Sequence, residues 1–92
     1  LLEDEINKNL SQMPDWQRVG DAISREFIFS DFTEAFDFMK ALAPKIDKQN
    51  HHPDWSNSYN KLTISFTSHE SGGLTQKDFD MARLVNLTHE AF

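Results

Sequence analysis

The stretch "NSYNKLTISFTSH", residues 57–69, alternates apolar and polar side chains over most of its length. In an extended chain Leu62, Ile64 and Phe66 would lie on one face, and the lysine and hydroxyl side chains between them on the other. This alternation predicts a half-buried β-strand. A sheet built around such a strand has one apolar face to hide, so we expect helices packed on that single face.

Two hairpins are expected around this strand. The preceding "WSNSY" predicts a shorter partner strand, with the bend at Asn60-Lys61. The segment "DWQRVGDAISREFIFS" predicts two more strands, joined by a turn at Gly20-Asp21. The side chains expected to share one side of the second of these strands are Ile23, Arg25, Phe27 and Phe29.

Helical spacing is strongest between the two hairpins. Asp31 can cap a helix there, with Glu34 at the spacing of a capping box. Pro44 removes a backbone hydrogen bond and should kink or loosen the last turn. Phe38 and Ala41 fall off the main apolar stripe, so we expect them on the outer surface, where an exposed Phe needs a partner. That stripe consists of Phe32, Ala35, Phe36, Met39, Leu42, Ala43 and Ile46.

Two further helices are expected at the ends of the chain. The first should end at Pro14, and the last should begin after Thr75, with Asp78 at the capping position. The resulting order predicts the α+β class: a four-stranded antiparallel sheet with three helices packed on one face (helix-strand-strand-helix-strand-strand-helix). The apolar residues of the two helices are Leu2, Ile6, Leu10 and Met13, and Phe79, Ala82, Leu84, Val85 and Phe92.

Length and composition restrict the classes of function. A chain of 92 residues fits one domain, residues 1–92. Its formal net charge of -6 opposes binding to the phosphates of nucleic acid. It has no cysteine, which rules out disulfides, thiolate nucleophiles and cysteine-containing zinc sites. No apolar run approaches the about 20 residues that cross a bilayer, and the acidic start is unlike a signal peptide, so a membrane is not expected as a partner.

The candidate functional residues are histidines. His51 and His52 stand before Pro53, which favours an extended backbone and hence diverging side chains. A shared site would need a bend and a third group, for which His69, at the end of the predicted strand, is the candidate. Three interpretations stay open: solvated loop residues, a zinc site, or metal-free acid-base chemistry by imidazole, whose ordinary pKa is about 6.5. The spacing from His52 to His69 matches no compact zinc motif, and no HExxH is present.

Short motifs extend outward from the histidine pair: HHPDW, with an aspartate four residues before it, then YNK, TSHE and GLT. In this pattern the chain resembles the pterin-4a-carbinolamine dehydratase family, also known as dimerization cofactors of a hepatic homeodomain transcription factor. The likeness covers about residues 20–86. It implies a hydro-lyase that converts 4a-hydroxytetrahydrobiopterin to quinonoid dihydrobiopterin, in tetrahydrobiopterin recycling after aromatic amino acid hydroxylation. No cofactor or metal is expected, because dehydration involves no net redox change.

The resemblance also implies roles by position. His51 and His69 match residues that transfer protons at the leaving hydroxyl, and His52 one that orients the pterin or assists. Asp78 is expected to orient a histidine ring and fix its tautomer. Trp16 matches an aromatic residue near the pocket, although a structural role is an equal alternative. The positions that match substrate-contacting residues are Asp47, Asn50, Thr67, Ser68 and Glu70, with the hydroxyls of Thr67 and Ser68 expected to hydrogen-bond the edge of the pterin.

Partners are implied in the same way. Family members form dimers that extend the sheet, and pairs of dimers joined through helices, so a homodimer or homotetramer is expected. Some bind the dimerization helix of a transcription factor, which gives the alternative function of a non-catalytic coactivator. The retention of all three histidines favours catalysis, because binding through an outer helix would not require them. The expected location is cytoplasmic, and also nuclear where such a transcription factor is present.

Overall fold

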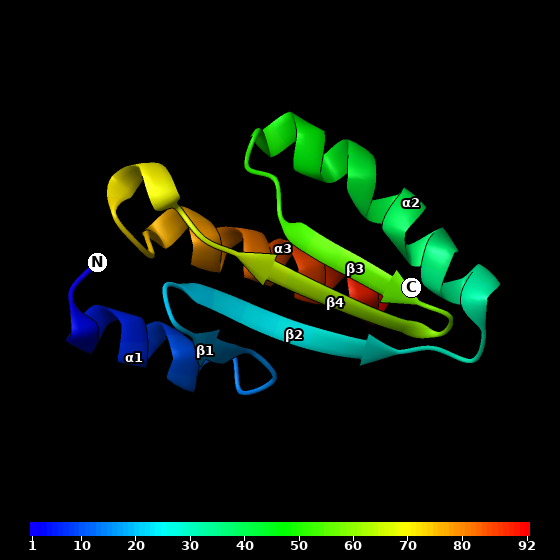
Figure 1. Cartoon of the computed structure of the whole chain (residues 1–92), viewed down its shortest axis with the longest axis horizontal. Coiled ribbons are helices and arrows are strands. Elements are labelled where there is room, and N and C mark those ends of the chain that lie inside the picture. Colours follow the sequence, from blue (N-terminus) through cyan, green and yellow to red (C-terminus); the bar gives the residue numbers. More distant parts are fainter.

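The structure, a computed structural model, describes residues 1–92 and contains the expected helices and strands in the expected order (Figure 1). The α+β class predicted from the sequence is confirmed. The elements are α1 (Glu3–Ser11), β1 (Gln17–Val19), β2 (Ala22–Ile28), α2 (Phe32–Gln49), β3 (Asp54–Ser58), β4 (Lys61–Phe66), the short 3-10 helix η1 (His69–Ser71) and α3 (Gln76–Ala91).

The four strands form one antiparallel sheet in the order β1-β2-β4-β3. In the central pair Phe27 of β2 lies opposite Leu62 of β4, and both side chains are buried. Ser24 and Ser65 lie opposite each other on the other face, where the Ser65 hydroxyl donates a hydrogen bond to that of Ser24 (3.0 Å). The period-two alternation in the sequence therefore divides the sheet into an apolar and a polar face.

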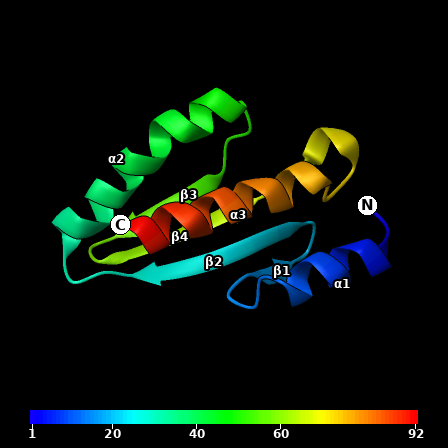
Figure 2. The ribbon, with the colours of Figure 1, turned by 180° about the vertical axis from the view of Figure 1, so that it is seen from behind.

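The helices cover the apolar face. Seen from behind, α3 runs along β4 and β2, while α2 and α1 lie to either side of it (Figure 2). Helices α2 and α3 pack against β4 and against each other. Phe66 of the sheet, Leu42 of α2 and Phe79 of α3 are completely buried, and Ile6 of α1 is 4% exposed. One hydrophobic core thus joins all three helices to the sheet.

Helix α2 buries a different stripe from the expected one. Phe38 is completely buried, whereas Phe32 and Phe36 are 48% and 47% exposed and stack on each other. The expectation that Phe38 lies on the outer surface is wrong. Phenylalanines at these three positions give the helix two apolar edges, and periodicity does not choose between them. The choice is made by Phe27 of β2 and by Phe29, which directly follows that strand: the ring of each lies 5.4 Å from the ring of Phe38.

The last turn of α2 remains closed although Pro44 lies within the helix. The helix continues to Gln49, and Asn50 ends it with a left-handed backbone (φ 51°). The Asn50 N–H donates to the carbonyls of Ile46 (3.0 Å) and Asp47 (3.1 Å). These bonds hold the turn that Pro44 was expected to loosen, and they fix the point where the histidine segment leaves the helix.

The bend between β3 and β4 lies one residue earlier than expected. Tyr59 and Asn60 form it, with Tyr59 at a positive φ of 54°, because Lys61 already pairs with Ser58 in the ladder. Asn60 also anchors the bend to the end of β2, since its carbonyl accepts from the Phe29 N–H (2.8 Å). Its side-chain amide donates back to the Phe29 carbonyl (3.0 Å).

Aromatic rings gather around the end of α3, where His89 lies among phenylalanines. Its ring centroid is 4.8 Å from that of Phe27 and 5.5 Å from that of Phe38. Burial in these surroundings lowers the pKa of His89, and the positive charge of Arg25 lowers it further. The neutral form of this histidine is therefore the one that the folded chain favours.

We expect Phe38→Ala to lower the free energy of unfolding by about 3–5 kcal/mol, because it leaves a cavity among packed rings. The matched variant Phe36→Ala, on the same helix but half exposed, should cost about 1 kcal/mol or less. Urea denaturation of both variants measures the difference. Equal losses would contradict the inward orientation of Phe38.

The fold should lose stability in acid because of His89. Its pKa in the folded chain lies below the about 6.5 of the unfolded chain, so the unfolded state takes up the proton first as the pH falls. Stability is then lost from about pH 6.5 downward. A His89→Gln variant should lose less stability than the wild type between about pH 7.5 and about pH 5, as measured by urea denaturation at both values. The same loss in both proteins would assign the acid sensitivity to other groups.

Candidate active site

The pairing of β3 with β4 brings the two histidine segments together. Because the strands are antiparallel, with Asp54 opposite Ser65, the residues just before β3 lie beside those just after β4. His51, His52 and His69 consequently line one cavity of about 590 Å³. Its other lining residues are Asn50, Thr67, Ser68, Glu70, Ser71, Thr75 and Lys77.

His51 is held between a carboxylate and an aromatic ring. Its Nε2 lies 2.6 Å from Oδ1 of Asp78. Its ring stacks on that of Phe66, with centroids 6.0 Å apart and an interplanar angle of 16°. An ionised carboxylate only accepts hydrogen bonds, so this partner places the proton on Nε2 and leaves Nδ1 of a neutral ring as an acceptor.

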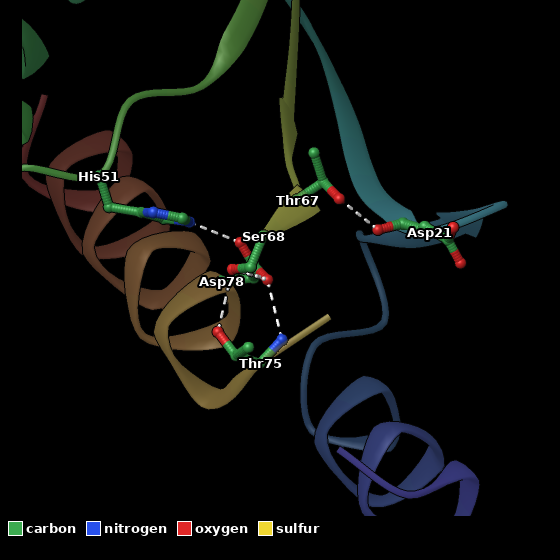
Figure 3. A network of polar contacts seen from close by, with 6 residues as sticks. All are labelled: Asp21, His51, Thr67, Ser68, Thr75 and Asp78. Carbon is green, nitrogen blue, oxygen red and sulfur yellow. Dashed lines mark hydrogen bonds and ion pairs between the residues drawn. The ribbon is translucent and has the colours of Figure 1, made fainter. Parts of the chain in front are cut away.

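Asp78 is completely buried and receives hydrogen bonds at both carboxylate oxygens. Oδ1 faces His51, and Oδ2 accepts from the Ser68 hydroxyl (2.8 Å) and from the Thr75 backbone N–H (2.9 Å) (Figure 3). Thr75 is the N-cap of α3, so Asp78 also lies in the first turn, where the helix dipole stabilises negative charge. This arrangement is what the expected orienting role of Asp78 requires.

His52 makes a more exposed pair with a second carboxylate. Its Nε2 lies 2.9 Å from Oδ1 of Asp47, and the two side chains are 57% and 75% exposed. Solvent therefore screens this pair, which adds little to stability. Both residues border a smaller, largely apolar cavity of about 170 Å³, and Asp47 does not reach the larger one. The remaining residues of the smaller cavity are Ala43, Ile46, Pro53 and Trp55.

The hydroxyls of Thr67 and Ser68 already donate within the protein. The Thr67 hydroxyl donates to the carbonyl of Asp21 (2.6 Å), and the Ser68 hydroxyl to Oδ2 of Asp78 (Figure 3). Both residues line the cavity, as expected of substrate-contacting positions. Each keeps lone pairs for a ligand, but its single donor proton is engaged elsewhere. The edge of the sheet thus offers acceptors rather than donors at these two positions.

Trp16 lies in the core and not at the cavity. It is 3% exposed, and its indole N–H donates to Oδ1 of Asn86 (2.8 Å). Its ring centroid lies 6.1 Å from that of Phe66, and Trp16 does not line the cavity. Its contacts with Phe66 of the sheet and Asn86 of α3 are those of a packing residue, and a contact with substrate stays a prediction. The structural alternative describes Trp16.

Three lining residues have no counterpart in the sequence-based site: Ser71, Thr75 and Lys77. Thr75 was expected only to cap α3, and Lys77 follows it in the first turn of the same helix. The capping pattern could have signalled both. A helix that begins beside a site presents its first turn to that site, so residues next to a predicted N-cap become candidates.

No group of three or more His, Cys, Asp or Glu side chains is arranged to hold a metal ion. His51 and His52 instead each direct Nε2 to one carboxylate.

None of the helices has the combination of length and apolar composition needed to cross a bilayer.

Comparisons with known proteins identify the family of the chain. The family described as pterin 4 alpha carbinolamine dehydratase matches residues 1–88. A relative from a Picosynechococcus species is 49% identical over 82 residues, which is 89% of each chain, and one from Rhodospirillum rubrum is 45% identical over 88 residues, covering 94% of this chain and 92% of its own. Both carry the name pterin-4-alpha-carbinolamine dehydratase.

A solved structure is similar over nearly the whole chain. It is the crystal structure of a transcriptional coactivator/pterin dehydratase from Brucella melitensis, which is 40% identical, covers 96% of both chains and superposes with a TM-score of 0.89. The comparisons of sequence and of fold therefore agree with each other. The chain belongs to the pterin-4-alpha-carbinolamine dehydratase family of hydro-lyases.

Proposed function

We propose that this chain dehydrates 4a-hydroxytetrahydrobiopterin to quinonoid dihydrobiopterin and water by histidine acid-base catalysis. One observation carries the proposal: three imidazoles line one polar cavity, and one of them, His51, is held by a buried carboxylate. Family membership supplies the reaction class. The cellular role that follows is recycling of tetrahydrobiopterin after aromatic amino acid hydroxylation, in the cytoplasm.

The reaction requires two proton transfers. The bond from C4a to the hydroxyl oxygen breaks, the N5–H bond breaks, and a double bond forms between C4a and N5. Hydroxide is a poor leaving group unless an acid protonates it, and N5 must lose its proton to a base. The hydroxyl group and the proton that it receives from the acid leave as one water. The proton that the base takes from N5 replaces the one that the acid gave, so the enzyme's net protonation and oxidation state do not change.

The geometry suggests how the histidines divide these tasks. With Nε2 committed to Asp78, the neutral His51 ring has Nδ1 to take the proton from N5. His69, exposed at the start of η1, is the group proposed to protonate the leaving hydroxyl. His52, fixed by Asp47, orients the pterin or assists. His51, His52, His69 and Asp78 therefore form the proposed catalytic group.

The character of the cavity suits a flat, polar heterocycle. All ten residues that line it are polar or charged, and the buried ring of Phe66 backs His51 from within. Asn50 and Glu70 supply amide and carboxylate groups that complement the ring nitrogens and amide-like edge of a pterin. Thr67 and Ser68 add acceptor lone pairs, and Asp47 acts through His52.

The alternative function is that of a non-catalytic coactivator that binds a transcription factor. The observation that favours it is the neighbour from Brucella melitensis, whose name combines transcriptional coactivator with pterin dehydratase. In this chain that function would use an outer helical surface and would add a nuclear location to the cytoplasmic one. The buried network around Asp78 would be unnecessary for it, so dehydration remains the first proposal.

Self-association as a homodimer or homotetramer is also proposed, but through a different part of α2 from the one that the sequence suggested. Phe38 is buried, so the candidate patch on α2 is the exposed pair of Phe32 and Phe36, whose rings stack 5.9 Å apart. Exposed aromatic pairs of this kind commonly mark interaction sites.

Replacing either proposed proton carrier should remove most of the activity while the fold remains. We expect His51→Ala and His69→Ala each to lower kcat about 10²- to 10⁴-fold. The matched control is His89→Gln, which removes an imidazole outside the cavity. Assayed well below its unfolding temperature, this variant should turn over at the wild-type rate. The measurement is a stopped assay of 4a-hydroxypterin disappearance, with and without chelator. Wild-type rates in either cavity variant would refute its role, and loss of activity with chelator alone would indicate a metalloenzyme instead.

Phe36→Asp should weaken assembly without unfolding the chain, because it places a charge in the exposed aromatic pair. Lys40→Asp, one turn further along α2 and also exposed, is the matched control for a new acidic side chain on this helix. Sedimentation velocity or light scattering of the variants and the wild type measures the molecular mass. An unchanged mass for Phe36→Asp would place the interface on another surface.

A further inference from the structure

The Ser68 hydroxyl lies at the wall of the cavity, in a relay of hydrogen bonds that leads inward to the buried carboxylate of Asp78. It donates to Oδ2 of Asp78 (2.8 Å) and lies 3.0 Å from the hydroxyl of Thr75 (Figure 3). Because the Ser68 hydroxyl donates its hydrogen bond to Asp78, it accepts the hydrogen bond from the Thr75 hydroxyl. The chain of contacts therefore runs from Thr75 through Ser68 and Asp78 to His51.

The backbone around Ser68 fixes its hydroxyl in that relay. The Ser68 carbonyl accepts from the N–H groups of Ser71 (2.9 Å) and Gly73 (3.3 Å). Gly72, at a φ of +79°, adopts the left-handed conformation that turns the chain after η1 back toward Thr75. The loop from η1 to α3 thus holds the hydroxyls of Ser68 and Thr75 side by side.

This relay controls the direction of the Asp78 carboxylate. Two donors, Ser68 and the Thr75 N–H, hold Oδ2, so Oδ1 is left to His51 alone. Removing the Ser68 donor would leave Oδ2 of the completely buried Asp78 with one partner, the Thr75 N–H. The carboxylate would then turn or would concentrate its charge on His51, and in either case the proton on His51 would be less well defined.

We infer that Ser68 is a positioning residue, which acts through Asp78 to keep the proton of His51 on Nε2 and its Nδ1 free. This inference rests on the proposed dehydration and deepens it. It replaces the direct contact with substrate expected for Ser68. Threonine at this position would keep the relay, because it retains the hydroxyl.

Ser68→Ala should lower kcat about tenfold, the loss typical of one hydrogen bond to a charged group, while KM changes little. Its pH–rate profile should differ from that of the wild type, because the Asp78 carboxylate no longer fixes the proton of His51 on Nε2. Ser68→Thr should restore both the rate and the profile. Ser65→Ala, on β4 and bonded only to Ser24 on the polar face of the sheet, is the matched control and should match the wild type.

Nitrogen NMR of ¹⁵N-histidine-labelled protein tests the relay without any turnover. The wild type and Ser68→Thr should show His51 with its proton on Nε2, and Ser68→Ala should show a mixture of tautomers. Should Ser68→Ala not fold, Ser68→Cys, a weak donor of similar size, should show an intermediate shift. Wild-type spectra and pH profiles in Ala and Cys variants overturn the inference. If the wild type does not dehydrate the pterin but Ser68→Ala still changes the tautomer of His51, the proposed function is overturned and the relay is kept.

Discussion

Because β3 and β4 run antiparallel, with Asp54 opposite Ser65, residues on both sides of a hairpin arrive at the same end of the sheet. The histidine pair reaches that end from α2 and His69 reaches it from β4. The chain has no cysteine, so no disulfide holds these segments together, and the position of the imidazoles depends on this register. A slip of one residue would turn Leu62, Ile64 and Phe66 away from the core, and the apolar face of the sheet thereby protects the geometry of the cavity.

The buried carboxylate of Asp78 is the second constraint, and it is an expensive one. Moving an ionised carboxylate out of water costs several kcal/mol unless its oxygens find donors. Here the donors come from three segments: His51 before β3, Ser68 after β4, and Thr75 at the start of α3. The charge therefore ties the loops of the site to one another. A structure that needed only to be stable would do as well with an apolar residue there, which favours a chemical reason for the charge.

Local patterns were sufficient to predict the elements, since alternation marked β4 and the capping residues Asp31 and Thr75 marked two helix starts. They failed where the outcome depended on contacts distant in sequence. Phe36 and Phe38 lie on different sides of α2, and helical periodicity allows either side to be the buried one. Only the rings of Phe27 and Phe29 decide that Phe38 is buried. The histidines could be grouped by family likeness, but the partner of each hydroxyl could not. Whether Ser68 faces a ligand or Asp78 depends on how the loop after η1 returns to α3.

Helix α3 connects the site to the stability of the fold. Asp78 in its first turn holds His51, and His89 in its last turn is packed among phenylalanines from β2 and α2. The eleven residue steps from Asp78 to His89 span about 16 Å of helix axis. Burial favours the neutral form of His89, so the packing at the C-terminal end of α3 is most stable near and above neutral pH. At the other end of α3, Asp78 holds the proton of His51 on Nε2 and leaves Nδ1 free. One rigid element thus carries both the carboxylate that orients the proposed base and the histidine whose protonation weakens the core.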